Sequence, residues 1–264
     1  MNYNYHTHTY RCRHARGTAE EYILKAIEGG IKYLGFAEHF PYTFPDGQEG
    51  KSRPPVSEAE EYVSELRSLR EKYKDKIELA IGFEMEYYPT YFEDMLTKAK
   101  GYGAEYLILG HHFLHEEHPV ALHVNRPNDR IEDLKEFVSY VVMGIESGVF
   151  TYVAHPDVFN FTGDTQIYKN EMRKICRAAT KSNTPLEINF LGIRGNRIYP
   201  NEIFWEMAGE EKSPVTFGCD SHGINDAYDD ESFVKAMSIV TKYNLNYIGK
   251  PNLKLLPISK EGGE

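Results

Sequence analysis

The chain alternates between short runs of apolar, β-branched and aromatic residues and longer segments in which apolar positions recur every three or four residues. Short apolar runs are typical of buried strands, and the longer spacing is typical of amphipathic helices. Regular alternation of the two predicts strand–helix units and a parallel sheet. The expected strands are Asn4–His8, Tyr33–Ala37, Ile77–Phe83, Tyr106–Leu109, Tyr152–Ala154, Leu186–Asn189 and Val215–Gly218.

The predicted helices follow the strands in turn, and two of them begin with a capping signal. Thr18 with Glu21, and Ser57 with Glu60, have the spacing of a capping box. The glycine pair at 29–30 is expected to end the first helix. The expected helices are Thr18–Glu28, Ser57–Tyr73, Tyr91–Lys100, Ile131–Glu146, Tyr168–Ser182, Asn201–Ala208 and Glu231–Tyr243.

Seven strand–helix repeats favour a closed or nearly closed barrel over an open sheet, in a single domain that spans residues 1–264. Two long connections, Phe40–Val56 and Phe113–Arg130, leave from the carboxyl ends of strands, where barrel active sites are built. Loops of this length are often functional lids, and the alternative is a disordered surface insertion. The tail Ser259–Glu264 is expected to fray.

Composition narrows the function classes. The chain has 264 residues, of which 41% are hydrophobic, and it contains no apolar stretch of the roughly 18 residues that a membrane span needs. The N-terminus lacks a basic region followed by an apolar one, so a cytoplasmic location is expected. A net charge of −10 makes nucleic acid an unfavourable partner, and an anionic substrate has to be attracted by local positive charge. The oligomeric state cannot be inferred from these features.

The cysteines Cys12, Cys176 and Cys219 are odd in number, and no pair has the spacing of a zinc ribbon. This usage predicts a reducing compartment and no disulfide framework. Cys219 adjoins Asp220, but a small buried side chain is the expected role for a free cysteine.

Residues that bind metals recur at the predicted strand ends. His6 and His8 stand at i and i+2 of the first strand, so they point to the same face. Such a pair alone is weak evidence, but later apolar runs are followed by similar residues. Imidazoles and carboxylates suit zinc, iron and manganese, and nine ligands are enough for two or three ions with bridging carboxylates. The nine candidates are His6, His8, His14, His39, Glu84, His112, His155, Asp220 and His222.

The order of these motifs resembles the PHP (polymerase and histidinol phosphatase) superfamily, and most closely its histidinol-phosphatase branch. The resemblance runs from Tyr3 to about Gly249 and implies a distorted (β/α)7 TIM-like barrel with a centre of three divalent metal ions. The motifs that carry it are His6-Thr7-His8-Thr9, Cys12-x-His14, Glu38-His39, Gly82-Phe83-Glu84, Ala154-His155-Pro156 and Asp220-Ser221-His222.

The resemblance also implies how the ligands are shared among the ions, which the residue types allow to be zinc, iron or manganese. In this arrangement Glu84 bridges two of the ions. The first ion is held by His6, His8, Glu84 and Asp220, the second by Glu84, His112 and His155, and the third by His14, His39 and His222.

Three positions depart from the pattern or offer a choice. Glu38-His39 stands where Asp-His is commoner in the superfamily. His112 is preferred to His111 because it directly precedes a Phe-Leu pair, and His111 is then expected in the barrel wall. Glu86 shares the strand face of Glu84 and stays an alternative ligand, although Glu84 directly follows Gly-Phe.

A cluster of this type favours phosphate-ester hydrolysis. Bridged ions lower the pKa of bound water and neutralise charge on phosphoryl oxygens. The attacking metal-bridging hydroxide is expected near Glu84 and Asp220, and Asp220 can orient it or take its proton. Asp220, His222 and Glu84 are the candidate catalytic residues. A protonated histidine or a second water could protonate the leaving oxygen, and the sequence does not choose between them.

Arginines supply the forked donors that phosphate prefers. Arg194 and Arg197 lie in the loop after the sixth strand, and Arg16 lies beside His14, so all three are candidate phosphate ligands. In the long second loop, His115, His118 and His123 are expected at the surface, although one of them could line a pocket. Glu116 and Glu117 in the same loop are expected to be solvated.

The resulting hypothesis is a metal-dependent phosphomonoesterase that acts on L-histidinol phosphate, in histidine biosynthesis. The alternatives within this chemistry are another small phosphorylated substrate, such as a sugar phosphate or nucleotide, and phosphotyrosine. An amidohydrolase also begins with His-x-His, but its usual bridge is a carboxylated lysine, and no lysine ends the third or fourth strand here. A non-catalytic metal-binding module is disfavoured because the ligand set is complete.

Overall fold

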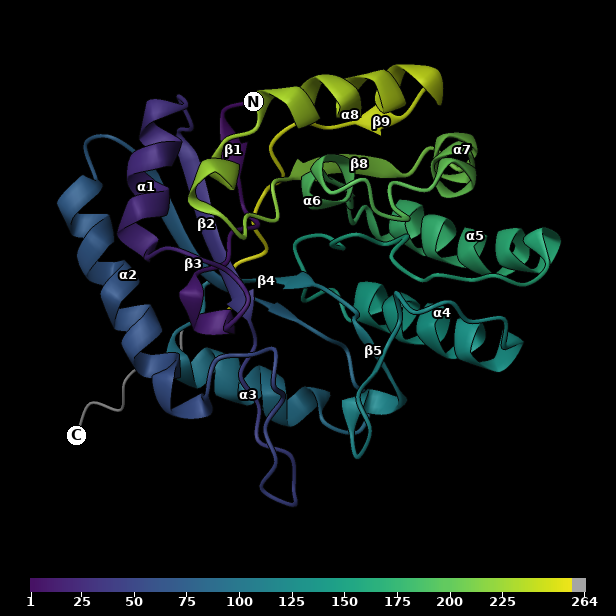
Figure 1. Ribbon diagram of the computed structural model, residues 1–264, viewed down its shortest axis with the longest axis horizontal. Helices are drawn as coiled ribbons and strands as arrows, with labels where there is room; N and C mark the ends of the chain where they lie inside the picture. The colour runs from purple at the N-terminus through teal and green to yellow at the C-terminus, as the bar shows by residue number, and fades with distance from the viewer. Residues whose placement is uncertain (258–264) are drawn as a thin grey trace.

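The computed structural model describes residues 1–257, and its centre is a curled parallel sheet with helices around the outside (Figure 1). β1 (Tyr3–Asn4), β2 (Tyr33–His39), β3 (Glu78–Met85) and β4 (Tyr106–Leu109) pair in this order, all parallel. β7 (Leu186–Asn189), β8 (Pro214–Gly218) and β9 (Asn246–Tyr247) form a second parallel group. Isolated parallel bridges from Leu109 to Val153 and from Val153 to Leu186 join the two groups.

Apart from α6, the helices of the described residues match the predicted segments to within a few residues. They pack their apolar faces on the outer face of the sheet, where the larger hydrophobic cluster lies. They are α1 (Ala19–Glu28), α2 (Ala59–Tyr73), α3 (Phe92–Tyr102), α4 (Ile131–Glu146), α5 (Thr165–Ser182), α6 (Phe190–Arg194), α7 (Glu202–Glu210) and α8 (Asp230–Lys242), with 3-10 turns at Tyr10–Cys12, Val56–Glu58, His115–Glu117 and Ile224–Ala227.

One of the two predicted capping boxes is confirmed. The Thr18 hydroxyl accepts a hydrogen bond from the Glu21 backbone, and the Glu21 carboxylate accepts one from the Thr18 backbone. The prediction at Ser57 was wrong, because Ser57 lies inside a 3-10 turn that follows Pro55 and leads into α2 without a side-chain cap. The spacing of Ser57 and Glu60 is the same whether the α-helix begins directly after Ser57 or is preceded by a 3-10 turn, so the sequence could not distinguish the two cases.

A second, smaller hydrophobic cluster fills the inside of the curled sheet. It takes residues from alternate positions of the strands, such as Tyr106 with Ile108 and Tyr152 with Ala154, as the two-residue period of a strand requires. The Tyr106 hydroxyl donates to the backbone oxygens of Tyr5, at 2.9 Å, and Phe36, at 3.1 Å. A tyrosine-rich layer thus supports the strand ends that carry the candidate ligands.

The segment after β9 crosses the amino ends of the strands (Figure 1). Its Lys254 backbone donates to the Thr151 hydroxyl, and its Leu256 backbone donates to the Glu105 oxygen, just before β4. The Lys250 ammonium lies 4.4 Å from the centre of the Tyr33 ring, at the start of β2. The last described residues therefore close the end of the sheet opposite the candidate ligands.

Both long loops contain short regular structure. The second loop forms an antiparallel hairpin of β5 (Phe113–Leu114) and β6 (Leu122–His123), which the sequence did not predict. An isolated bridge joins Thr43 and Glu49 in the first loop. Of the predicted strand Tyr152–Ala154, only Val153 is bridged, while α6 and β9 were not predicted. The predicted tail Ser259–Glu264 lies outside the described residues.

Two composition-based expectations can be compared with the described chain. Cys12, Cys176 and Cys219 are all buried and free, so residues 1–257 contain no disulfide, as predicted. Among these residues, no helix is both long and apolar enough to cross a membrane.

Asp157, in the segment after Val153, is a buried carboxylate held between two donors of the α7 region. Its Oδ2 accepts from the Asn201 backbone at 2.6 Å and from the Trp205 indole at 2.9 Å. Burial outweighs these hydrogen bonds and raises the pKa of Asp157 to about 6. Because the folded pKa lies above the unfolded value, the folded state prefers the protonated form, and stability falls as pH rises from about 4 to about 6.

Asp157→Asn is therefore expected to remove a pH-dependent part of the unfolding free energy. An asparagine oxygen can still accept from Asn201 or Trp205, and it does not ionise. Between pH 4 and pH 7, the unfolding free energy of the variant minus that of the unaltered chain should rise by about 3 kcal/mol. Urea unfolding of both proteins across this range measures the gain, and a difference that is constant with pH would contradict the prediction.

Candidate metal centre

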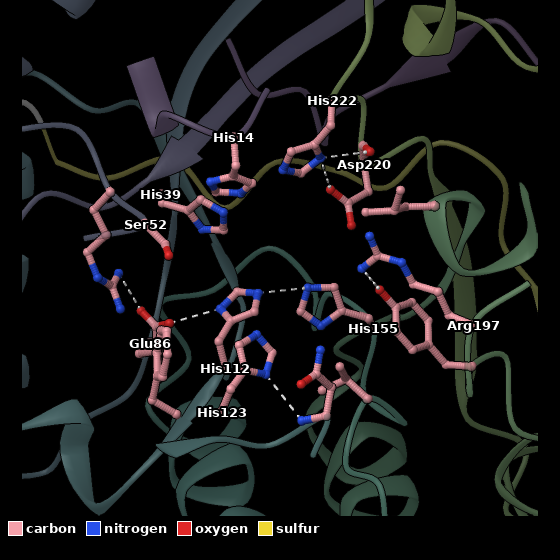
Figure 2. A pocket seen from close by; sticks show the side chains of 16 residues that line it. His14, His39, Ser52, Glu86, His112, His123, His155, Arg197, Asp220 and His222 are labelled. Atoms are coloured by element: carbon pink, nitrogen blue, oxygen red, sulfur yellow. Dashed lines mark hydrogen bonds and ion pairs between the residues drawn. The ribbon is translucent and has the colours of Figure 1, made fainter. Parts of the chain in front are cut away.

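Six of the nine predicted ligands line a cavity of about 390 Å³ at the carboxyl ends of the strands (Figure 2). The other three, His6, His8 and Glu84, are buried within reach of these six. His6 and His8 follow β1, His39 ends β2, and Glu84 lies near the end of β3. The remaining five come from the segments after the first 3-10 turn, β4, Val153 and β8. Ligand atoms within 4.8 Å of one another form the groups His6/His8/Glu84, His39/Glu84/His112, His14/His39/His222, His6/His155/Asp220 and His8/Cys12/His222.

Glu84 lies at the centre of these groups and is almost fully buried. Its two oxygens face different imidazoles, which is the arrangement that a carboxylate bridging two ions needs. Oε2 lies 3.5 Å from His6 Nε2, 3.4 Å from His8 Nε2 and 3.1 Å from His39 Nδ1, while Oε1 lies 2.9 Å from His155 Nε2 and 3.5 Å from His112 Nε2.

Asp220 faces the same imidazoles from the opposite side. Its Oδ1 lies 3.6 Å from His6 Nε2, 3.5 Å from His8 Nε2 and 3.1 Å from His222 Nδ1. Asp220 and His155 both have left-handed backbones, with φ of 46° and 29°. Such a conformation is strained for residues other than glycine, and it is typical of functional sites, where a side chain must be aimed at one point.

The unused hydrogen-bonding capacity of the site tests whether it fits metal ions. His6 Nε2, His8 Nε2, both oxygens of Glu84 and Oδ1 of Asp220 are buried, and none has a hydrogen bond of good geometry within residues 1–257. Buried polar atoms without such partners are costly, and here they all face one another. Nitrogen and carboxylate donors that converge in this way fit divalent cations.

Carboxylates behind the imidazoles fix which ring nitrogen faces the cavity. His6 Nδ1 is 2.8 Å from Glu187, and His8 Nδ1 is 3.2 Å from Glu38. In each ring the Nε2 atom is left to face Glu84 and Asp220. Such acidic partners orient histidines that bind metals. Sequence reasoning did not assign Glu38 or Glu187, although an acid before His39 and another inside a buried strand were the available signals.

The site keeps its two central carboxylates ionised. Burial would raise the pKa of Glu84, but His112, His6 and His39 hold it well below the usual range. Burial likewise opposes ionisation of Asp220, and His6 and His222 keep its pKa well below normal. Two buried anions so close together make the cavity attractive to cations.

Burial keeps two imidazoles of the site, His14 and His39, in the neutral form that binds metals. Burial and the neighbouring His8 lower the pKa of His39 well below its usual value. Burial, His222 and His8 lower the pKa of His14 to about 4. His6 differs, because Glu187, Asp220 and Glu84 outweigh its burial and raise its pKa. Neighbouring carboxylates also raise the pKa of His112 and of His222. The acidic centre therefore favours a positive charge at His6, whether from a proton or a metal ion.

The sequence left two ligand choices open, His111 or His112 and Glu84 or Glu86, and the geometry favours one residue of each pair. The ring of His111 is buried 5.8 Å from the Tyr88 ring, in the wall, whereas His112 lines the cavity. Glu86 also lines the cavity, but its oxygens lie 2.9 Å from His112 Nδ1 and 2.8 Å from an Arg53 nitrogen. These distances favour Glu84 and His112 as ligands and Glu86 as a partner of His112.

Among the candidate phosphate ligands, only Arg197 lines the cavity, where its Nη1 lies 3.1 Å from the Tyr199 hydroxyl (Figure 2). Arg16 is exposed and lies outside the lining. Arg194 differs from the expectation: it donates to the backbone oxygens of Cys219, at 2.6 Å, and Asp220, at 2.7 Å. Its guanidinium also pairs with aspartates of the same loop, so it is occupied in holding that loop.

Arg194→Ala is therefore expected to loosen the loop that carries Asp220. The free energy of unfolding should fall by about 1.5–3 kcal/mol, the range for hydrogen bonds from a charged donor. Urea unfolding measures this loss. An unchanged unfolding free energy would show that the contacts to Cys219 and Asp220 contribute nothing.

The hairpin of the second loop adds residues to the cavity. Phe113 and His123 are paired across it, their rings are 5.1 Å apart, and both line the cavity. His123 Nδ1 accepts a hydrogen bond from the Asn125 backbone at 3.1 Å. His115 is exposed, as predicted, but Glu117 is buried, and its expected solvation was wrong because it pairs with the buried Arg53. Sequence reasoning had no signal for Arg53, which lies in a polar loop.

The PHP domain family model matches residues 4–190, which is most of the chain. The chain belongs to the PHP domain family. The expected resemblance to the histidinol-phosphatase branch is confirmed by curated relatives that carry this name. A probable histidinol-phosphatase of Deinococcus radiodurans is 24% identical over 226 residues, covering 82% of this chain and 85% of the relative. A histidinol-phosphatase of Bacillus subtilis is 24% identical over 262 residues, covering 87% of this chain and 97% of the relative.

A solved structure has the same fold. It is the histidinol phosphate phosphatase of Lactococcus lactis, complexed with zinc, L-histidinol and phosphate. The TM-score is 0.70 with 19% sequence identity, and the match covers 93% of this chain and 95% of the other. At this identity the likeness establishes the α/β fold with its curled parallel sheet.

Proposed function

We propose that this PHP domain is a metal-dependent phosphomonoesterase that hydrolyses L-histidinol phosphate to L-histidinol and phosphate. The observation that carries the proposal is the set of buried, unpartnered imidazole and carboxylate atoms that face one another beside the cavity that Asp220 lines. The names of the relatives from Deinococcus radiodurans and Bacillus subtilis support the substrate. The zinc, L-histidinol and phosphate in the Lactococcus lactis structure support both the metal and the substrate.

The cluster would hold three divalent ions, with zinc, iron and manganese all compatible with its donors. Divalent ions supply acidified water and neutralise charge on phosphoryl oxygens. The mutual distances support the sharing of ligands that the family resemblance implies, with Glu84 between two ions. By the family resemblance, the ligands would be His6, His8, Glu84 and Asp220 for the first ion, Glu84, His112 and His155 for the second, and His14, His39 and His222 for the third. The distances among His6, His8 and Glu84, from Glu84 to His112 and His155, and among His14, His39 and His222 support this division.

The chain's own residues bind the phosphate and orient the reacting groups. Asp220 is ionised, and its Oδ1 is fixed 3.1 Å from His222 Nδ1, so it can orient a nucleophilic water at a defined position. Glu84 is ionised and faces the imidazoles of His6, His8 and His39. Arg197 brings a cation to the wall near Asp220 and His155. In a chain with a net charge of −10, such local positive charge is needed to attract a phosphate.

Arg197→Ala is expected to weaken substrate binding more than turnover. Loss of a charged hydrogen bond to phosphate costs about 1.5–3 kcal/mol, which corresponds to a rise in KM of about 10-fold to 150-fold. Steady-state kinetics with histidinol phosphate measure this. Arg177→Ala is the matched control, because Arg177 is exposed on α5 and pairs with Glu211 outside the cavity. Unchanged kinetics in Arg197→Ala would remove this residue from the site.

We further propose that residues 1–264 form one domain and that the sheet closes as a distorted seven-stranded barrel, in a protein of the cytoplasm. The parallel bridge from Thr7 to Ser221 supports closure, because it joins the first strand to the segment after β8. Two backbone hydrogen bonds accompany it, from His8 to Ser221 and from Ser221 to His6.

A substrate panel tests the function. Purified protein, with its metal content determined, is assayed for phosphate release from histidinol phosphate, a pentose phosphate, a nucleoside monophosphate and a phosphotyrosine peptide. We expect kcat/KM for histidinol phosphate to exceed the others by at least about 100-fold, as a site that pairs polar groups of its substrate can achieve. Comparable turnover of all four compounds would exclude the specific assignment, and a protein without bound metal would exclude the mechanism.

A further inference from the structure

Arg53 is a buried cation that joins the two long loops to β3. Only 4% of it is exposed, and its carboxylate partners Glu86 and Glu117 are 1% and 6% exposed. Arg53 Nη1 lies 2.8 Å from Glu86 Oε2, while Nε donates to Glu117 Oε2 at 3.1 Å. The same Glu117 oxygen accepts from Nη2 of Arg53 and, at 3.2 Å, from the Tyr88 hydroxyl.

Glu117 reaches Arg53 from a strained backbone. His115, Glu116 and Glu117 have φ values of 55°, 55° and 66°, so three successive residues other than glycine are left-handed. Each such residue is unfavourable, and a run of three persists only where the surroundings fix it. The Thr90 backbone holds the Glu116 carboxylate at 2.8 Å, and Glu136 accepts from the His115 backbone. The whole turn is thus built to aim Glu117 inward.

Arg53 also fixes its own loop against the other. Its Nη1 donates to the Phe40 backbone oxygen at 3.2 Å, at the start of the loop that contains it. Nearby, the Phe44 ring stacks on His118 with centroids 4.9 Å apart, and His118 pairs with Asp46 at 3.4 Å. The two loops therefore meet beside the cavity through Arg53 and through His118.

The other carboxylate of this cluster leads directly to the candidate metal centre. Glu86 Oε1 lies 2.9 Å from His112 Nδ1, and His112 Nε2 lies 3.5 Å from Glu84 Oε1. Glu86 can keep His112 in this orientation only while its own carboxylate is held, and Arg53 holds the second oxygen. The contacts form a continuous series from Glu117 through Arg53 and Glu86 to His112.

We propose that Arg53 is a positioning residue, which links the docking of the two loops to the orientation of His112 as a metal ligand. The guanidinium fork is needed because two carboxylates on different segments must be held at once, and a lysine ammonium is not preorganised for this. A buried ion pair by itself is weak evidence for a role in stability. Here Glu86, one partner of the buried Arg53, itself contacts the predicted ligand His112. The inference rests on the metal-binding part of the proposed function.

Metal affinity tests the inference without any substrate. Zn²⁺ alone is titrated into the chelator-treated full chain in competition with a chromophoric chelator, for the unaltered protein and for Arg53→Met. Loss of a group that orients a metal ligand typically weakens metal binding by 10-fold to 100-fold, so we expect at least one zinc site of Arg53→Met to weaken by this factor. Arg53→Lys should restore only part of the affinity.

Two further variants separate positioning from stability. Glu117→Gln keeps Arg53 and Glu86 but removes the charge that holds the guanidinium from the hairpin loop, so it should weaken the same site to a smaller degree. It also provides the test if Arg53→Met fails to fold. Arg173→Met is the matched control, because Arg173 bridges Glu210 and Glu211 on the outer surface and should leave zinc affinity unchanged.

The outcomes distinguish the two proposals. A lower melting temperature with unchanged zinc affinity in both Arg53→Met and Glu117→Gln would overturn the positioning role and leave the proposed function intact. Failure of the unaltered chain to bind Zn²⁺ would overturn both. Weakening of one site in the Arg53 and Glu117 variants, but not in Arg173→Met, would support the inference.

Discussion

Asp220→Asn is expected to lower kcat for phosphate release by about 10³-fold or more. Asp220 Oδ1 lies within 3.6 Å of nitrogen atoms in His6, His8 and His222. The amide has nearly the same shape but no charge, so it does not supply the anionic ligand that the site needs. Divalent ions contribute several kcal/mol to such reactions, and a loss of about 4 kcal/mol corresponds to about 10³ in rate.

The measurement is single-turnover or steady-state phosphate release, with folding checked by circular dichroism. His8→Ala should cause a loss of similar size, because His8 lies 3.4 Å from Glu84 and 3.5 Å from Asp220. Asp230→Asn is the control, since Asp230 is exposed at the start of α8. Near-normal turnover by Asp220→Asn would exclude Asp220 from the chemistry.

Removal of metal is expected to abolish phosphatase activity and to lower the melting temperature. Ions that occupy the site at 1,000 times their dissociation constant stabilise the folded state by about 4 kcal/mol per site, and dialysis against a chelator removes this contribution. Without the ions, the ionised carboxylates of Glu84 and Asp220 remain buried beside imidazoles such as His6.

Activity assays and thermal melting before and after dialysis measure both effects. Addition of Zn²⁺ or Mn²⁺ to the dialysed protein should restore activity and melting temperature together, because both depend on the same ions. Full activity after exhaustive chelation, with no bound transition metal, would exclude the metal-dependent mechanism.

The strands, helices and converging ligands could be predicted because each has a local signal. Alternating apolar runs mark β2 and β3, and a histidine or an acid after each strand marks the candidate ligands. In a parallel sheet all strands deliver their carboxyl ends to the same side, so sequence order alone predicts that His6, Glu84 and Asp220 meet. The three-dimensional positions agree with this expectation.

The residues behind the ligands could not be predicted, because their roles depend on contacts between distant segments. Glu187 meets His6 across 181 positions of sequence, and Arg53 meets Glu117 across 64. Nothing in the polar loop around Arg53 distinguishes a buried cation from a solvated one. For Arg194 the sequence suggested a phosphate ligand because of its position in the loop. It gave no signal that the guanidinium donates to the backbone oxygens of Cys219 and Asp220.

The segment after β9 has a consequence for how the polypeptide is made. It contacts the starts of β2 and β4 through Lys250 and Leu256, so a stretch translated more than 200 residues after β2 began covers the amino end of a sheet whose first strands were made much earlier. Contacts of such long sequence separation slow folding. Nascent chains stalled before residue 250 should therefore remain open at that end of the sheet and sensitive to protease.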